Sequence, residues 1–236
     1  MEHLWKEKSV WAYWVCVTIA ILTTAIALFL DLSAWFDDSQ SASECWRFAR
    51  TVLCGLALVG VIKTHGNTTD KWLMLLALSL AVIADYFLIL KNNLVTGIGI
   101  FAIMQIVLIA RHSIGVSFKK FYQPQIGFAV AIGLLVLLIG NGLLWSSLSE
   151  KGLTIPVLIY SSLLITSVVT AYSTRFTGLL STKQANYAFM GMILFLLCDI
   201  TVGIGAAFGH TSEGQLVRSL TGLFYTPSLL LLAKSA

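Results

Sequence analysis

Long apolar runs separated by short polar segments dominate the chain. Several runs are about 20 residues long, which is the length of helix that crosses the hydrocarbon layer of a bilayer. The alternation of polar and apolar residues that marks a membrane β-barrel is absent from the sequence. The pattern predicts a single all-α membrane domain, residues 1–236, with eight transmembrane helices at about 11–32, 46–63, 72–90, 94–111, 124–145, 153–172, 186–208 and 216–233.

Composition agrees with the membrane class. Of the 236 residues, 58% are hydrophobic and only 11% are charged, whereas a soluble domain has about 25% charged residues. The net charge of +4 comes from basic residues scattered at the ends of the expected helices, which argues against a nucleic-acid partner. The 4 cysteines form no CxxC or Cys/His spacing, so we expect no metal site.

The positions of the basic residues predict the topology. An even number of spans places both termini on one side of the membrane. Ten of the 15 basic residues lie on that side: Lys6, Lys8, Lys63, Lys71, Arg111, Lys119, Lys120, Arg175, Lys183 and Lys234. Because cytoplasmic loops are enriched in Lys and Arg, we expect cytoplasmic termini. Both the inner membrane of a bacterium and the endoplasmic reticulum membrane of a eukaryote fit this multi-pass arrangement.

Two expected helices carry an aspartate within an otherwise apolar sequence. Asp85 lies in the outer half of helix 72–90, and Asp199 lies near the middle of helix 186–208. An ionised carboxylate near the centre of a span costs roughly 2.5–3.5 kcal/mol on insertion scales, so packing alone does not account for either residue. Two carboxyls in different environments can act as a general acid and a general base. The alternatives are a hydrogen-bonded helix contact or an ion pair between Asp85 and Arg50.

Three further polar side chains lie at a similar depth. Gln105 is midway along the fourth helix, Tyr225 is midway along the last, and Arg50 is about one turn inside the second. Polar groups within a membrane usually face the bundle interior or a water-filled cavity. We therefore expect them to meet the two aspartates in one cavity between the midplane and the outer face. Alternatively, Gln105 could form a hydrogen bond between helices, and Tyr225 could be a packing residue. The alternative for Arg50 is that its side chain extends to the membrane interface.

Four stretches resemble the YhhN-like family, which includes the transmembrane lysoplasmalogenases. They read LSLAVIADYFLIL, GIGIFAIMQIVLIAR, GMILFLLCDITVGI and FYTPSLLLLAKS, and the resemblance spans about residues 72–235. It implies that Asp85 and Asp199 are the two acidic positions of the family. It also implies that Phe101 and Phe195 are its aromatic positions and that Tyr225 is the tyrosine of its last helix.

The chain departs from the family pattern at four places. Ala84 replaces a glycine, Cys198 replaces a serine, and Arg50-Thr51 is the nearest match to a Lys-Pro. Gln105 stands where the family usually has a histidine. A histidine can shuttle protons and a glutamine cannot, so the change at position 105 bears on activity rather than on the fold.

By resemblance, the expected function is hydrolysis of the vinyl-ether bond of a lysoplasmalogen. The products are a fatty aldehyde and glycerophosphocholine or glycerophosphoethanolamine. We expect Asp199, as the deeper and more desolvated carboxyl, to be the acid and Asp85 the base, without a metal or redox cofactor. The residues expected to bind the lysophospholipid are Arg50, Phe101, Gln105, Phe195 and Tyr225, with Arg50 expected to hold its phosphate. Two alternatives stay open: a catalytically impaired relative that binds lysolipids, and a proton-coupled small-molecule transporter.

Overall fold

The computed structural model describes residues 2–37, 43–62, 68–114, 124–150, 152–177, 180–208 and 211–236. Its helices are α1 (Glu2–Phe36), α2 (Glu44–Ile62), α3 (Thr68–Asp85), the short π-helix η1 (Tyr86–Leu90), α4 (Leu94–Ser113), α6 (Pro124–Glu150), α7 (Thr154–Thr177), α8 (Thr182–Ala207) and α9 (Ser212–Lys234). The described residues contain no strand, so the all-α prediction is confirmed for this part of the chain.

Seven helices are long and apolar enough to cross a membrane. They belong to α1, α3 with η1, α4, α6, α7, α8 and α9, which supports a multi-pass membrane protein. Helix α2 is not among the seven, and its first two turns carry Glu44, Arg47 and Arg50. The eighth span and the cytoplasmic termini therefore stay predictions. Three of the basic residues behind the topology prediction lie outside the described residues: Lys63, Lys119 and Lys120.

Several helices extend beyond their expected ends. Helix α6 continues to Glu150 and α7 to Thr177. Helix α8 begins at Thr182 because Ser181 caps it: the Ser181 hydroxyl accepts from the Gln184 backbone N–H, and the Gln184 side chain accepts from the Ser181 N–H. This reciprocal pair is a capping box. Between the expected helices 153–172 and 186–208, residues 173–177 and 182–185 are thus helical.

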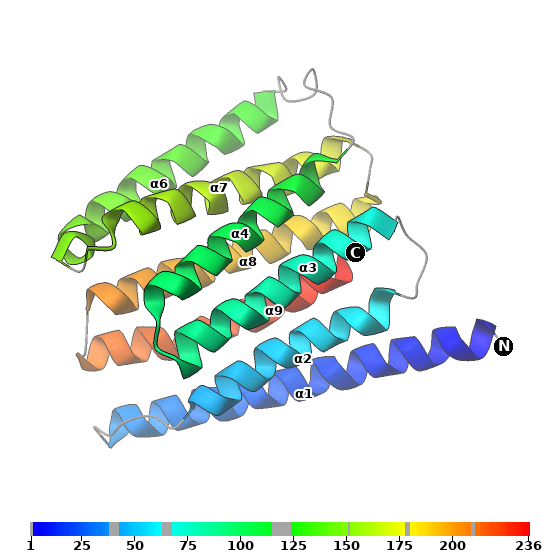
Figure 1. The fold of residues 1–236 in the computed structure, drawn as a ribbon, viewed down its shortest axis with the longest axis horizontal. Coiled ribbons are helices and arrows are strands. Elements are labelled where there is room, and N and C mark those ends of the chain that lie inside the picture. Colours follow the sequence, from blue (N-terminus) through cyan, green and yellow to red (C-terminus); the bar gives the residue numbers. More distant parts are fainter. Residues whose placement is uncertain are drawn as a thin grey trace.

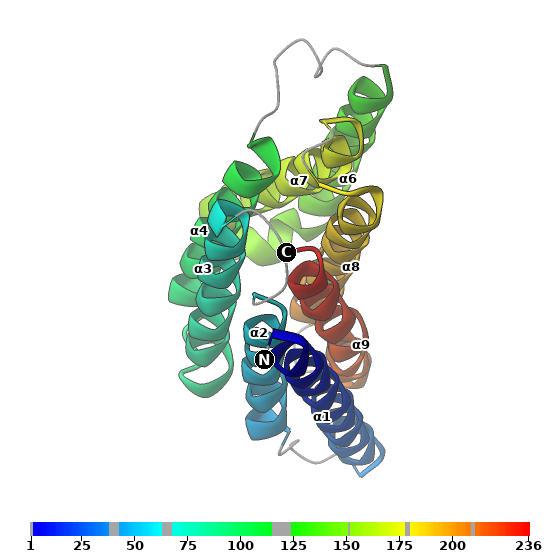
Figure 2. The same ribbon diagram turned by 90° about the vertical axis from the view of Figure 1, so that its right-hand side faces the viewer.

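Successive helices run in opposite directions along a common bundle (Figure 1). The start of α1 and the end of α9 lie toward the same end, which we call the terminal end. Viewed along the bundle, α3 and α4 form one wall and α8 and α9 form the facing wall, with α1 and α2 on one side and α6 and α7 on the other (Figure 2). Sequence neighbours pack closely in these pairs. The bundle therefore brings polar side chains of distant segments into one space.

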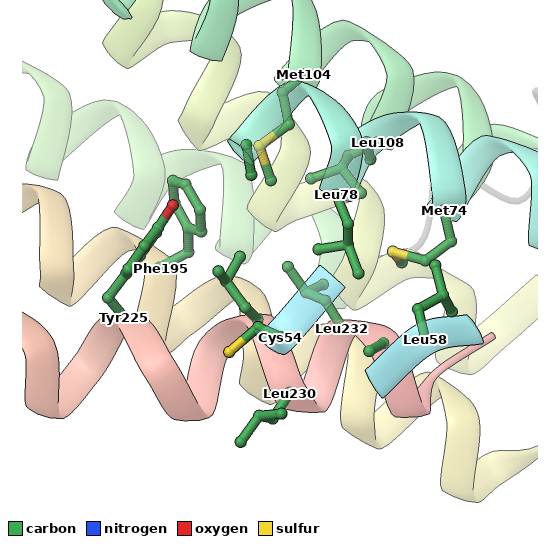
Figure 3. Close-up of a cluster of buried hydrophobic side chains, with 14 of the residues drawn as sticks. Cys54, Leu58, Met74, Leu78, Met104, Leu108, Phe195, Tyr225, Leu230 and Leu232 are labelled. Atoms are coloured by element: carbon green, nitrogen blue, oxygen red, sulfur yellow. The ribbon is translucent and has the colours of Figure 1, made fainter. Parts of the chain in front are cut away.

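Small side chains build the centre of the bundle. Cys54, Ala57, Ala77, Ala81 and Ala84 are all completely buried, and small residues let membrane helices approach closely. Larger aliphatic side chains and methionines fill the part nearer the terminal end (Figure 3). On the outside, many large apolar side chains are exposed, as expected of a surface that faces lipid.

A buried ion pair closes the terminal end. Arg111 donates from Nε to Asp70 Oδ1 at 2.7 Å and from Nη2 to Asp70 Oδ2 at 2.9 Å. The same guanidinium donates to the hydroxyl and the carbonyl of Ser235, both at 2.9 Å. The topology prediction treats Arg111 as a basic residue at a membrane face. In the structure Arg111 lies at this end of the bundle, where its side chain is buried and its charge is balanced by Asp70.

Candidate active site

A cavity of about 370 Å³ lies toward the end of the bundle opposite the terminal end. Its wall is mostly apolar, and side chains of α2, α3, η1, α4, α6, α7, α8 and α9 contribute to it. Its volume falls in the range of ligand pockets, about 300–1,000 Å³. Both aspartates singled out from the sequence line this cavity, together with Arg50, Phe101 and Tyr225.

Asp85 is the last residue of α3, at the point where the regular helix passes into η1. This π-helical turn ends the helical segment at Leu90, and π-helical turns often occur at functional sites. The carboxyl is 5% exposed, and the Thr51 hydroxyl of α2 donates to its Oδ2 at 2.6 Å. Asp85 is therefore held in place across the α2–α3 contact.

Asp199 enters the cavity from α8, in the wall that faces α3 (Figure 2). It is half-buried, and the Tyr160 hydroxyl of α7 forms a hydrogen bond to its Oδ2. Asp85 is the less exposed residue of the two, so residue exposure does not support the expectation that Asp199 is the more desolvated carboxyl. The contact with Thr51 of α2 accounts for the low exposure of Asp85.

Aromatic rings form one side of the cavity. Phe101 and Phe195 meet edge to face with ring centroids 5.8 Å apart, and Phe195 meets Tyr225 in the same way at 5.8 Å. Phe101 and Tyr225 line the cavity, whereas Phe195 is completely buried and absent from its lining. The contact between Phe195 and Tyr225 is visible at the edge of the apolar cluster (Figure 3). Phe195 thus supports two lining residues from behind.

Gln105 lies behind the cavity rather than in its wall. Its side chain is completely buried, and neither its amide nitrogen nor its amide oxygen has a hydrogen-bond partner in the structure. It lies near the Tyr160 hydroxyl, but the geometry is not that of a hydrogen bond. The structure therefore does not place Gln105 with the other polar residues that were expected to meet in the cavity.

Arg50 lines the cavity and is 6% exposed. Its guanidinium carbon lies 5.6 Å from the centre of the Tyr225 ring, and its Nε has no hydrogen-bond partner. It forms no ion pair with any carboxylate in the described parts of the chain. The snorkelling alternative does not fit this burial, and the alternative of an Arg50–Asp85 ion pair is not seen.

Several polar residues in or beside the cavity were not selected as site residues from the sequence. Thr51 and Tyr160 hold the two aspartates, and Arg47 and Arg218 line the cavity. Arg47 could have been found, because it stands three residues before Arg50 and so shares its helix face. Threonine and tyrosine are ordinary residues of membrane helices, and the sequence does not reveal which of them meets an aspartate.

Among the residues that the structure describes, no three His, Cys, Asp or Glu side chains are grouped so that they could hold a metal ion.

Comparison with known proteins gives one match. The sequence model of the YhhN family matches residues 45–236. No curated protein and no solved structure matches the chain. The matched range contains every residue that lines the cavity.

Proposed function

We propose that this chain, which belongs to the YhhN family, is an intramembrane hydrolase that cleaves the vinyl-ether bond of a lysoplasmalogen. The products are a fatty aldehyde and glycerophosphocholine or glycerophosphoethanolamine. The observation that carries the proposal is that two carboxyls from facing walls line one mostly apolar cavity. A vinyl ether is hydrolysed by protonation at carbon, which needs an acid, a base and an apolar place for the alkenyl chain.

Asp199 acts as the acid in this proposal and Asp85 as the base. The exposure of the two carboxyls does not support the assignment made from the sequence, but their neighbours do. Asp85 accepts a hydrogen bond from Thr51, which directly follows Arg50 in α2, whereas Asp199 accepts from Tyr160 of α7. A carboxyl near a cation is the better base, and a carboxyl near another carboxylate is the better acid.

The reaction consumes one water molecule. Asp199 protonates the alkenyl carbon that is not bonded to oxygen, which leaves an oxocarbenium ion stabilised by the Asp85 carboxylate. Asp85 then takes a proton from a water molecule as the water oxygen bonds to the cationic carbon, and a hemiacetal forms. In its collapse Asp85 returns this proton to the leaving glycerol oxygen, and Asp199 takes the hemiacetal proton. Both carboxyls end in their starting states.

Two hydroxyl groups position these carboxyls. Thr51 donates to Asp85 at 2.6 Å and Tyr160 donates to Asp199. Both bonds cross between helices, so they hold each carboxyl in one orientation toward the cavity. Reacting groups must be held within a fraction of an ångström of the productive geometry, and these bonds supply that restraint.

A lysolipid-binding protein without hydrolase activity is the second candidate. The observation that favours it is Gln105, which stands at the usual histidine position of the family-like pattern and cannot shuttle protons. It lies beside Tyr160 and thus near the proposed acid. The proton-coupled transporter stays a third expectation, with the same two aspartates as its relay.

Aldehyde release separates these candidates. Purified protein is given a lysoplasmalogen or, as a control, the saturated ether lysolipid of the same chain length and head group. The hydrolase proposal predicts aldehyde from the vinyl ether alone, and no aldehyde from the Asp85→Asn and Asp199→Asn variants. Folded wild-type protein that binds both lipids and releases no aldehyde would favour the lysolipid binder. Proton-coupled flux without aldehyde would favour the transporter.

A further inference from the structure

Three arginine side chains line the cavity. Arg47 and Arg50 come from α2, and Arg218 comes from the second turn of α9. Asp31 forms an ion pair with Arg47 at 2.5 Å, but Arg50 has no such partner within the described residues. Like charges gathered in a mostly apolar cavity are stabilised by a bound anion.

Two glycines make room for these arginines. A Cβ atom at Gly222 would collide with Nη1 of Arg50 and lie 3.2 Å from its Cζ. A Cβ atom at Gly205 would lie 2.6 Å from Cγ of Arg218, and the Gly205 carbonyl accepts a hydrogen bond from Arg218 Nη1 at 3.0 Å. Glycines in α8 and α9 thus leave space for the side chains of Arg218 and Arg50. This fit indicates a built site rather than arginines that happen to lie near one another.

We propose that Arg50 and Arg218, with Arg47, form a subsite for the phosphate group of a single-chain glycerophospholipid. A guanidinium group binds phosphate oxygens through paired N–H donors, and three such groups can surround one phosphate. This inference rests on the proposed function for the identity of the lipid. The mostly apolar remainder of the cavity, lined by α6 and α7 residues such as Leu137, Leu144 and Ile165, receives the alkenyl chain.

The position of this subsite suits the proposed reaction. Arg50 and Thr51 are consecutive in α2, and Thr51 holds the Asp85 carboxyl. A phosphate bound by Arg50 therefore places the short glycerol unit beside Asp85, with the vinyl ether directed toward Asp199. The phosphate subsite determines which bond of the lipid meets the two carboxyls.

Equilibrium binding to protein in lipid nanodiscs tests the subsite without any reaction. The probes are a saturated 1-O-alkyl glycerophosphocholine, which lacks the vinyl ether, and the 1-O-alkylglycerol of the same chain length, which lacks the phosphate. We expect wild-type protein to bind the phosphate-bearing lipid at least about tenfold more tightly, because hydrogen bonds between a guanidinium group and a phosphate are strengthened by their charges. The Arg50→Gln and Arg218→Gln variants should lose this preference.

Further variants keep the test independent of folding. Gly222→Ala should weaken phosphate-dependent binding because it displaces Arg50 without removing a charge. Arg175→Gln should leave the preference unchanged, because Arg175 stacks on Phe189 outside the cavity, with its guanidinium carbon 4.4 Å from the ring centre. Equal affinity of wild-type protein for the two lipids would overturn the proposal. So would a preference that persists in folded Arg50→Gln and Arg218→Gln proteins.

Two controls separate this inference from the hydrolase proposal and from a free anion. The Asp85→Asn and Asp199→Asn variants should keep the preference for the phosphate-bearing lipid even though they release no aldehyde. If wild-type protein shows the preference but releases no aldehyde, the hydrolase proposal fails and the phosphate subsite stands. Inorganic phosphate that binds as tightly as the lipid would assign the arginines to free phosphate and overturn the headgroup assignment.

Discussion

The two ends of the bundle each hold a buried arginine, and the two arginines differ in their partners. At the terminal end, Arg111 is 1% exposed and donates to Asp70 and Ser235. In the cavity, Arg50 is 6% exposed, stacks on Tyr225 and has no ion pair in the described parts of the chain. Buried charges are normally paired. This contrast is consistent with a structural role for Arg111 and with the proposed ligand-binding role of Arg50.

The same contrast holds for the aspartates. Asp70 accepts two hydrogen bonds from one cation and ties α3 to α4. Asp85 and Asp199 each accept from one neutral hydroxyl group and face a cavity. A carboxylate that is fully paired stabilises a fold, and one that keeps part of its hydrogen-bonding capacity open can act on a substrate. Variants at the two ends should therefore separate stability from activity.

Loss of either cavity carboxyl should have the largest effect on activity. The Asp85→Asn and Asp199→Asn variants each remove a general acid or base, a role that contributes about 10²–10⁴-fold to rate. We expect aldehyde release to fall at least about 100-fold in each variant while the unfolding temperature stays close to that of wild type. A large loss of stability in both variants would show that these aspartates serve the fold, and would remove the contrast with Asp70.

The ion pair of the terminal end should show the opposite behaviour. The Asp70→Asn variant leaves Arg111 as a buried charge without its carboxylate, which costs about 3–5 kcal/mol when a buried pair is broken. Thermal unfolding in detergent should register this loss as a clear fall in unfolding temperature. The Asp85→Asn variant is the matched control. Similar unfolding temperatures for the two variants would contradict the assignment of Asp70 to stability.

Removal of the two arginine charges sharpens the comparison. The Arg111→Gln variant should be less stable than wild type, because it leaves the Asp70 carboxylate unpaired. The Arg50→Gln variant should be as stable as wild type without lipid, or more stable, because it removes a buried charge that lacks an ion-pair partner. Thermal unfolding of both variants in lipid-free detergent measures the difference. An equal fall in both would show that Arg50 is a structural residue.

The smallest effect is expected for the hydroxyl that holds Asp199. In the Tyr160→Phe variant the ring and its packing remain, but the hydrogen bond to Asp199 is lost. We expect the kcat of aldehyde release to fall about tenfold, with KM little changed, because about 1.4 kcal/mol of positioning is lost. Tyr172→Phe, at a tyrosine that packs on Phe189 outside the cavity, is the control. Equal activity of both variants would exclude a positioning role for Tyr160.

Much of the fold follows from the hydrophobic pattern, and part of the site follows from the polar residues that interrupt the apolar runs. Asp85 and Asp199 stand out because an aspartate within a long apolar run is costly, and both line the cavity. Phe195 and Gln105 were expected at the site and lie behind its surface instead. Which face of a buried helix borders a cavity depends on the neighbouring helices, and a single apolar sequence does not contain that information.

The partners of the site residues were beyond sequence reasoning. Thr51 and Asp85 are 34 residues apart, and Tyr160 and Asp199 are 39 apart. Hydroxyl residues are common in membrane helices, where most of them bond to their own backbone. Arg218 lies near the start of its helix, where a basic residue usually marks the membrane interface. Its sequence position therefore did not indicate a site residue.

Mass analysis of the product formed in heavy water tests the central claim most directly. If an acid in the cavity protonates the alkenyl carbon, the aldehyde released from a lysoplasmalogen in D₂O carries one deuterium on the carbon next to the aldehyde group. The aldehyde is trapped at once to prevent later exchange, and aldehyde added in protonated form serves as the control. The account predicts one deuterium per product molecule. Aldehyde without deuterium, or no aldehyde from folded protein, would contradict it.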